Sequence, residues 1–319
     1  MTGVNTVLGV NGGSEECSTL FGPYGTRLEQ IGKEVGRPDI VAPTAVLTSQ
    51  TARDAVAQIA GEYVDAGARV ATINAFGLRR LLHEGEHRLY EEAIQAQQDA
   101  MVRGVRTYAR DGVMKVLSVG PYGDCYKVEE APCRGLAKDF HELQVKGFEK
   151  SDADVLWFET IGTIEEAVGI GQAAASVVPT VISFIIDEKG RLRSGESVRD
   201  AIQAVDDATR PNLVRYSFNC CPIEGLEPAI ASAGELAGRI IACYPNASSE
   251  DPGKLCGSDG VQKVKDPKQV AQYLRFLAKR HNLVIVGGCC GHDQESVSWI
   301  SGVADVVGRN DCHLHRHSL

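Results

Sequence analysis

The chain has 319 residues, 43% of them hydrophobic and 24% charged, which is the composition of a folded protein rather than a disordered or collagen-like one. The formal net charge is -9 and the basic residues are scattered, so we expect no nucleic-acid partner. No run approaches the roughly 18 apolar residues of a membrane span, and the first residues lack the basic and apolar regions of a signal peptide. These features predict a cytoplasmic protein, without a membrane partner, whose ten cysteines stay reduced.

Eight short apolar runs, rich in β-branched residues, recur along the chain. They are residues 6–10, 69–73, 114–119, 155–158, 180–186, 213–218, 239–243 and 283–286. Runs that are apolar almost throughout are typical of parallel strands buried on both faces, because an exposed face would give alternation. We therefore interpret them as eight parallel strands.

Helical segments separate these strands. Apolar residues recur at helical spacing in residues 51–66, 90–109, 138–150, 163–175, 197–207 and 267–280. Eight strand-then-helix units in about 300 residues predict a single (β/α)8 TIM barrel, with residues 1–319 as one domain. A doubly wound open sheet is the alternative, but Gly9, Gly12 and Gly13 do not form a G-x-G-x-x-G turn.

Two segments stand outside this repeat. Residues 246–266 are rich in glycine, serine and charge, and a loop of about 20 residues in a compact domain is usually functional or disordered. We interpret it as an active-site loop, with a plain insertion as the alternative. Residues 312–319 contain three histidines, and we expect them to form a frayed tail.

Cysteines follow two of the predicted strands. Cys220 and Cys221 come after the sixth strand, and Cys289 and Cys290 come after the eighth. In a TIM barrel the carboxyl ends of the strands surround one mouth, so these thiols can meet. Three thiolates are good tetrahedral ligands for Zn²⁺ and leave a fourth position for a substrate.

The residues alone leave two interpretations of these cysteines open. A free cysteine often behaves as a small buried hydrophobe, which favours a structural role. A metal site is favoured by Gly287 and Gly288, because they make a poor core strand and would let the backbone turn tightly before two adjacent ligands. We take Cys220, Cys289 and Cys290 as the metal group. Cys221 is the substitute if Cys220 is wrong, because neighbours in an extended segment point in opposite directions.

Two other functions remain open from the residues. His83 to His87 spell H-E-x-x-H, the pattern of zinc metalloproteases, although Gly85 weakens the helix that the motif needs. We expect His83 and His87 on an exposed helix. A non-enzymatic alternative uses the two cysteine pairs for redox or metal sensing.

Several motifs together resemble those of one enzyme family. The most specific are Phe218-Asn219-Cys220 and Gly287-Gly288-Cys289-Cys290-Gly291, and supporting matches are Ala66-Gly67-Ala68, Phe158-Glu159-Thr160 and Tyr244-Pro245-Asn246. They are similar to signatures of the zinc-dependent homocysteine S-methyltransferases, which are (β/α)8 barrels. The segment from Ser118 to Gly123 resembles the branch that uses S-methylmethionine.

The resemblance implies an activity and a set of site residues. It implies transfer of a methyl group from a sulfonium or ammonium donor, with S-methylmethionine favoured, to the thiol of homocysteine, giving methionine. It assigns Cys220, Cys289 and Cys290 as Zn²⁺ ligands and Glu159 as the contact for the homocysteine amino group. The remaining expected substrate contacts are Asn11, Gly12, Gly13, Asn74, Phe76, Tyr244 and Asn246.

The chemistry of these residue types agrees with that activity. Zn²⁺ on three thiolates lowers the pKa of a substrate thiol, so no general base is needed. The cationic donor favours an aromatic-lined mouth, for which Phe76, Tyr122 and Tyr244 are candidates.

The chain also departs from the family pattern. Asn11 stands where the family has an aspartate, and the second predicted strand ends in Ile73-Asn74-Ala75-Phe76 where the family has two threonines before an aromatic residue. These positions belong to the amino-acid-binding region of the family. A different thiol or a selenol is therefore the alternative acceptor.

Overall fold

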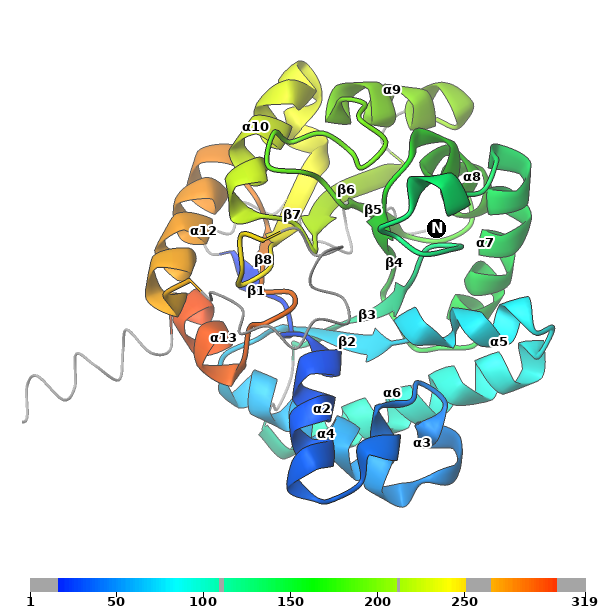
Figure 1. Ribbon diagram of the computed structural model, residues 1–319, viewed down its shortest axis with the longest axis vertical. Coiled ribbons are helices and arrows are strands. Elements are labelled where there is room, and N and C mark those ends of the chain that lie inside the picture. The colour runs from blue at the N-terminus through cyan, green and yellow to red at the C-terminus, as the bar shows by residue number, and fades with distance from the viewer. Residues whose placement is uncertain (1–16, 109–111, 211–212, 251–264, 303–319) are drawn as a thin grey trace, which may run out of the picture.

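Eight parallel strands form one sheet that closes into a barrel. The computed structural model describes residues 17–108, 112–210, 213–250 and 265–302. The strand order is β1-β8-β7-β6-β5-β4-β3-β2, and a parallel bridge between Leu20 and Val70 joins the two ends of the sheet. Helices surround the strands, as Figure 1 shows. The prediction of a (β/α)8 barrel is confirmed.

Seven of the predicted strands lie where the apolar runs placed them, within one to three residues at most ends. The strands are β1 (Ser18–Thr19), β2 (Val70–Asn74), β3 (Met114–Val119), β4 (Val155–Ile161), β5 (Thr180–Phe184), β6 (Val214–Asn219), β7 (Ile240–Tyr244) and β8 (Ile285–Val286). The predicted first strand, residues 6–10, lies outside the described residues. Among the described residues, the position between β8 and β2 belongs to Ser18–Thr19, which the apolar runs did not predict. A two-residue strand of serine and threonine gives no apolar run to detect.

All six predicted helices are present, with ends shifted by a few residues. The helices that match are α4 (Gln50–Asp65), α6 (His87–Tyr108), α7 (Arg134–Glu149), α8 (Ile164–Ala174), α9 (Val198–Ala208) and α12 (Pro267–His281). Short helices add to them: α2 (Tyr24–Glu34), α3 (Ala45–Thr48), α5 (Arg79–His83), α10 (Leu226–Ala233) and α13 (Gln294–Ser301), with 3-10 turns η1 (Pro38–Val41), η2 (Phe76–Leu78), η3 (Val128–Glu130), η4 (Ile223–Gly225) and η5 (Gly234–Arg239).

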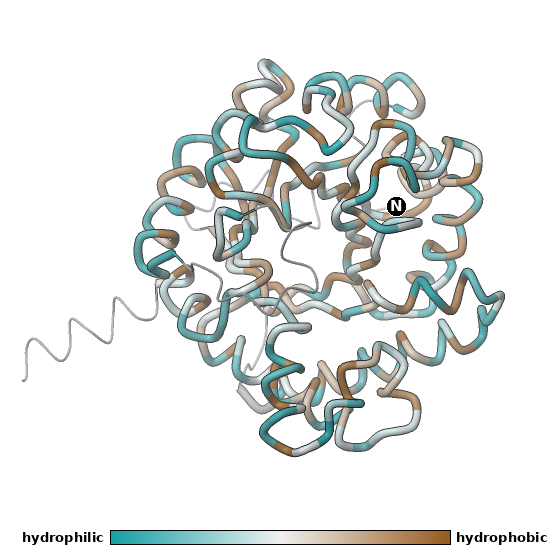
Figure 2. The backbone as a smooth tube through the Cα atoms, in the orientation of Figure 1, coloured by the Kyte–Doolittle hydropathy of each residue, from teal (hydrophilic) through white to brown (hydrophobic). Residues whose placement is uncertain are grey.

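Side chains alternate between the inside of the barrel and the layer under the helices. On β4, Val155 and Trp157 belong to the interior cluster, whereas Leu156 and Phe158 pack against the helices. Both sets are buried, which is why the strands read as continuous apolar runs. Figure 2 shows polar residues along the outer helices and apolar residues concentrated on the strands. In the described part of the chain, no helix combines the length and the apolarity that crossing a bilayer requires.

A cavity of about 300 Å³ opens at the carboxyl ends of the strands. Its walls come from the strand ends and from the segment between β1 and α4, which contains α2, η1 and α3. A Cβ atom added at Gly77 would lie only 2.3 Å from Pro43 Cγ. Any larger residue at this position would therefore push the segment that contains Pro43 away from the loop after β2. The strand ends that carry most of the predicted site residues surround this cavity.

Candidate metal and substrate site

Three cysteines meet at one end of the cavity. Cys220 follows β6, and Cys289 and Cys290 follow β8. The Sγ atom of Cys220 lies 2.8 Å from that of Cys289 and 3.7 Å from that of Cys290. All three Sγ atoms lie within 4.8 Å of one another, and no other described group of three or more His, Cys, Asp or Glu residues has this arrangement. Zn–S bonds of about 2.3 Å place tetrahedral sulfur ligands roughly 3.8 Å apart. The 3.7 Å separation of Cys220 and Cys290 has this spacing, whereas Cys220 and Cys289 lie closer together.

Local backbone geometry separates Cys220 from its neighbour. Cys220 has a φ of 49°, in the left-handed region, directly after the last residue of β6. Its side chain lines the cavity, whereas Cys221 is fully buried in the hydrophobic core. Burial raises the pKa of the Cys221 thiol and keeps it in the neutral form. Of the two cysteines, the structure brings Cys220 to the group.

The loop after β8 is held by backbone hydrogen bonds and by close packing. Cys289 N donates to Pro245 O at 2.8 Å, and Ala247 N donates to Cys290 O at 3.0 Å. The expected tight turn at Gly287 and Gly288 was wrong, because the glycine with a left-handed φ is Gly291. Gly288 is needed for close approach instead, since an added Cβ would lie 2.5 Å from the His292 ring.

Hydrogen bonds between the three thiols link their ionisation. Hydrogen bonds with Cys220 and Cys289 lower the pKa of Cys290, and hydrogen bonds with Cys289 and Cys290 raise the pKa of Cys220. Three thiolates this close repel one another unless a positive ion lies among them. A soft divalent cation such as Zn²⁺ matches this donor set.

Glu159, on β4, lines the same cavity. Its Oε1 accepts a hydrogen bond from the Tyr244 hydroxyl at 3.2 Å, and the same hydroxyl lies 3.2 Å from Ser183 Oγ. Burial raises the pKa of Glu159 to about 7, while hydrogen bonds from Ser118 and Tyr244 act in the opposite direction. Hydrogen bonds therefore hold the carboxylate in place, and a cationic partner beside it would stabilise its ionised form.

Asn219 connects the carboxylate to the thiol group. Its Oδ1 accepts a hydrogen bond from the backbone N of Thr160 at 2.9 Å, and Thr160 has a φ of 60°. Asn219 immediately precedes Cys220, and Thr160 immediately follows Glu159. This bond between the ends of β4 and β6 fixes the spacing of the two functional groups.

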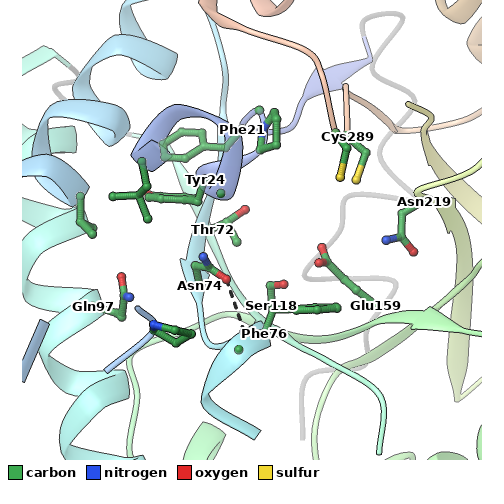
Figure 3. A pocket seen from close by; sticks show the side chains of 18 of the residues that line it. Phe21, Tyr24, Thr72, Asn74, Phe76, Gln97, Ser118, Glu159, Asn219 and Cys289 are labelled. Carbon is green, nitrogen blue, oxygen red and sulfur yellow. Dashed lines mark hydrogen bonds between the residues drawn. The ribbon is translucent and has the colours of Figure 1, made fainter. Parts of the chain in front are cut away.

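The predicted substrate contacts divide into three groups. Asn74, Phe76, Glu159 and Tyr244 line the cavity, and Figure 3 shows Asn74, Phe76 and Glu159 around it. Asn246 is buried beside the cysteine loops, where its backbone N donates to Cys221 O, but it is not among the residues found to line the cavity.

Asn11, Gly12 and Gly13 lie outside the described residues. Their assignment rested on a strand at residues 6–10, whereas the described strand in that position ends at Thr19 and is followed by Phe21 and Gly22, which line the cavity. Tyr122 stacks edge-on against Phe140 and His83 and is not among the described cavity-lining residues.

The structure adds residues that the sequence did not reveal. Tyr24 and Gln97 line the cavity from α2 and α6. His292 is buried near Cys290, and neither of its ring nitrogens has a hydrogen-bond partner among the described residues. Its position two residues after Cys290 is the one sequence signal that marks it.

The H-E-x-x-H motif is divided between two helices. α5 ends at His83, Gly85 has a φ of 76°, and α6 begins at His87. The expectation of one continuous helix was wrong, because Gly85 breaks it. His83 Nε2 lies 2.8 Å from Tyr122 O, and its ring stacks on Phe140, so this histidine holds the loop after β3.

The predicted active-site loop is only partly described. Residues 251–264 lie outside the described residues, as does the predicted tail at 312–319. At the loop's far end, Lys265 N donates to Ala247 O at 2.9 Å, and the Lys265 ammonium pairs with Glu224. Both ends of the segment are therefore tied next to the thiol group.

Comparison with known proteins shows where this chain belongs. The family model described as homocysteine S-methyltransferase matches residues 20–303. Homocysteine S-methyltransferase 1 of Arabidopsis thaliana is 24% identical over 315 residues, covering 89% of this chain and 92% of the relative. Selenocysteine Se-methyltransferase of Brassica oleracea var. italica is 23% identical, covering 85% of this chain and 84% of the relative.

A solved structure has the same fold. The metallated form of the homocysteine methyltransferase MmuM from Escherichia coli superposes with a TM-score of 0.71, at 18% identity, over 93% of this chain and 99% of its own. With the family match extending over most of the sequence, this chain belongs to the homocysteine S-methyltransferase family.

Proposed function

We propose that this protein transfers a methyl group from a sulfonium or quaternary ammonium donor, with S-methylmethionine as the favoured donor, to the thiol of homocysteine, giving methionine. The observation that carries the proposal is the group of three thiols and one partly buried carboxylate in a single cavity. The relatives named homocysteine S-methyltransferase support the acceptor.

We propose Zn²⁺ as the cofactor, held by Cys220, Cys289 and Cys290. When bound, the ion would lower the pKa of the acceptor thiol, so that the nucleophilic thiolate exists at neutral pH. The protein contributes the placement of its ligands. Backbone bonds fix the β8 loop, and the Asn219–Thr160 bond fixes Cys220 relative to Glu159.

Glu159 would bind the ammonium group of homocysteine. Tyr244 and Ser118 donate hydrogen bonds to this carboxylate, which orients it without neutralising it. Burial makes an unpaired carboxylate costly, so a cationic partner at this point gains more than it would in water. Asn74 and Phe76 line the neighbouring wall.

Phe76 and Tyr244 are the cavity-lining rings that could contact the cationic donor, and they differ in what already packs against them. The Arg79 guanidinium lies 4.8 Å from the Phe76 ring centroid, so one face of that ring already has a cation. Tyr244 packs edge-on against Trp157 at 6.0 Å. A sulfonium group is therefore expected against the free face of Phe76 or against Tyr244.

The cytoplasm is the proposed location, because its reducing conditions keep metal-binding thiols free. The eight cysteines in the described segments are all unpaired. The partners are the small-molecule thiol and the methyl donor.

The test is elemental analysis of the purified protein together with a product assay. We expect zinc, and methionine formation from S-methylmethionine and homocysteine that stops after chelation and returns when zinc is added. Selenocysteine and thiols without an amino group belong in the same acceptor screen. Turnover that persists after complete zinc removal would contradict the mechanism.

A further inference from the structure

Two pairs of consecutive residues line the cavity from β4 and β6. Glu159 and Thr160 follow one another in β4, Asn219 and Cys220 follow one another at the end of β6, and all four line the cavity. Consecutive residues of a regular strand point to opposite faces, so a regular strand would bring only one residue of each pair to the cavity. The backbone therefore departs from the regular strand at both places.

On β4 the departure is one extra residue. The register with β5 shifts between Phe158 and Ile161, where Glu159 and Thr160 lie opposite a single residue of β5. Two residues opposite one is the arrangement of a β-bulge, which changes the direction of side chains and is frequent beside active sites. The Thr160 hydroxyl donates to Glu159 O at 2.6 Å within this bulge.

The second residue of each pair has a left-handed backbone. Thr160 has a φ of 60° and Cys220 a φ of 49°. This region is unfavourable for residues other than glycine and asparagine, and most of all for a β-branched residue such as threonine. The other described non-glycine residue of this kind, Asn282, ends α12, where asparagine often adopts this conformation. Strained residues such as Thr160 persist only where the surrounding structure holds them.

Asn219 connects the two strained residues. It directly precedes Cys220, and its Oδ1 accepts a hydrogen bond from Thr160 N at 2.9 Å, across β5. We call this bond between Asn219 and Thr160 the clamp. Asn219 is 1% exposed and Thr160 is 2% exposed, so water does not compete for the bond. Figure 3 shows Asn219 and Glu159 on the same side of the cavity as Cys289.

We propose that the clamp sets the distance between Glu159 and the thiol group, and that it thereby selects the acceptor by the number of carbon atoms between its sulfur and its ammonium nitrogen, which is three. Asn219 and Thr160 are then positioning residues that determine specificity. This inference rests on the proposed function, in which the acceptor sulfur lies at the thiol group and its ammonium group at Glu159. Homocysteine has three such carbons, whereas cysteine and selenocysteine have two.

A fixed distance between the two binding points discriminates between acceptors of different length. With the sulfur held at the thiol group, loss of one methylene moves the ammonium nitrogen by roughly 1 Å, and a displacement of this size has large effects in a rigid site. The shorter acceptor then makes a poorer charged hydrogen bond to Glu159, which corresponds to about tenfold in affinity. A site with a loose backbone at Thr160 would adjust and would not discriminate.

The first test measures acceptor binding by calorimetry, with zinc-loaded protein and no methyl donor. The probes are 2-aminoethanethiol, 3-aminopropane-1-thiol and 4-aminobutane-1-thiol, which differ only in the number of carbons. We expect the wild type to bind the three-carbon probe about tenfold more tightly than either neighbour. Ethanethiol, 1-propanethiol and 1-butanethiol have no ammonium group and should show no optimum at three carbons.

Two variants remove the clamp from its two sides. Asn219→Leu removes the acceptor of the bond, and Thr160→Gly keeps the N–H donor but makes the backbone flexible at this position. Each should reduce the tenfold preference to about twofold, because the distance is no longer fixed. Zinc content is measured in both. If Asn219→Leu loses zinc or does not fold, Thr160→Gly alone decides.

The second test measures the strain at Thr160 by thermal denaturation without any ligand. Glycine normally makes a strand less stable than alanine does, but this order reverses where φ is positive. We expect the Tm of Thr160→Gly to exceed that of Thr160→Ala by about 2–4 °C.

Thr180 is the matched control. It is buried in β5, its hydroxyl donates to Val178 O at 2.8 Å, and it is not among the described residues with a positive φ. Thr180→Gly should therefore melt below Thr180→Ala. Both Thr180 variants should keep the preference for the three-carbon probe.

The outcomes separate this inference from the proposed function. A three-carbon preference that both clamp variants retain, or an equal fall in affinity for all three amino thiols, would overturn the clamp assignment. The usual order of Tm at Thr160, with alanine above glycine, would also overturn it. An optimum at two carbons that both variants abolish would support the clamp and contradict homocysteine as the acceptor. If the zinc-loaded protein binds no thiol, the proposed function fails and the selection fails with it.

Discussion

At the scale of single residues, the site depends on side chains that neighbouring backbone groups hold in place. Cys220 reaches the cavity because its backbone leaves the strand conformation, and Glu159 reaches it at an irregularity of β4, where the register with β5 shifts between Phe158 and Ile161. Asn219 and Thr160 then bind one another across β5. Cys220 and Glu159 thus each have a sequence neighbour, Asn219 and Thr160, whose role is positional.

Removal of one thiol should separate metal binding from folding. We expect Cys290→Ser to lose nearly all bound zinc, because a hydroxyl is a much weaker zinc ligand than a thiolate. Cys133→Ser is the control, since Cys133 is exposed at the start of α7, away from the group. Elemental analysis of both variants, with circular dichroism to check folding, gives the answer. Full zinc occupancy in Cys290→Ser would remove Cys290 from the ligand set.

Glu159→Gln should weaken homocysteine binding and leave the metal site intact. A hydrogen bond to a charged group is worth roughly 1.5–3 kcal/mol and a neutral one about 1 kcal/mol, so the KM for homocysteine should rise on the order of tenfold. 1-Butanethiol, which has no amino group, is the control acceptor and should be affected little. An equal loss with both acceptors would show that Glu159 does not bind the ammonium group.

The raised pKa of Glu159 predicts a pH dependence of acceptor selection. The pKa is about 7 in the free protein, so the carboxylate becomes neutral as the pH falls through that value, and homocysteine loses its ionic partner. The ratio of kcat/KM for homocysteine to that for 1-butanethiol should therefore decrease below pH 7. Tyr244→Phe removes a hydrogen bond that lowers this pKa and should move the decrease to higher pH. A ratio that does not change with pH would contradict the assignment.

At the scale of elements, sequence periodicity predicted most strands and helices because the barrel buries both faces of each strand. Met114–Val119 was predicted to the residue. Ser18–Thr19 could not be predicted, since its place in the sheet comes from pairing with Ile285 and Val286, which are far away in sequence. The thiol group was predictable because its residues occur in motifs at strand ends. Tyr24 and Gln97 were not, because packing of α2 on the loops and helices around it brings them to one cavity.

The broken helix at Gly85 gives a prediction about the second metal motif. His87→Ala should leave zinc content and stability unchanged, since α6 begins at this exposed residue. His83→Ala should also retain zinc but should lower the free energy of unfolding by about 1 kcal/mol, because it loses the bond to Tyr122 O. Zinc analysis and chemical denaturation of the two variants distinguish the outcomes. Zinc loss in both variants would reinstate the H-E-x-x-H site.

At the scale of the whole molecule, stability and chemistry lie at opposite ends of the barrel. Arg239 and Asp206 form a buried ion pair at 2.5 and 3.0 Å beside the beginning of β7, and Arg239 also donates to Val214 O. The cavity lies at the other ends of the strands. Substitutions at the two ends should therefore act independently.

Breaking the buried pair should destabilise the fold without altering the site. Asp206→Ala leaves an unpaired buried guanidinium and should lower the free energy of unfolding by about 3–5 kcal/mol, with zinc content unchanged in the folded fraction. Arg199 and Glu235 form an exposed pair between the same two elements, α9 and η5, so Glu235→Ala is the control, with an expected loss below about 1 kcal/mol. Equal losses from the two variants in urea denaturation would contradict the burial argument.

The two shortest strands of the barrel have a consequence for how the site exchanges with solvent. β1 and β8 contain two residues each, so β8 is held in the sheet only by short pairings with β1 and with β7. Segments with few backbone bonds open first in native-state fluctuations. Cys289 and Cys290 are attached to β8, so the fluctuation that opens this junction also moves two of the three thiols away from Cys220. Amide hydrogen exchange at Ile285 and Val286 and the rate of metal release would then report the same opening event, and a bound ion would slow both.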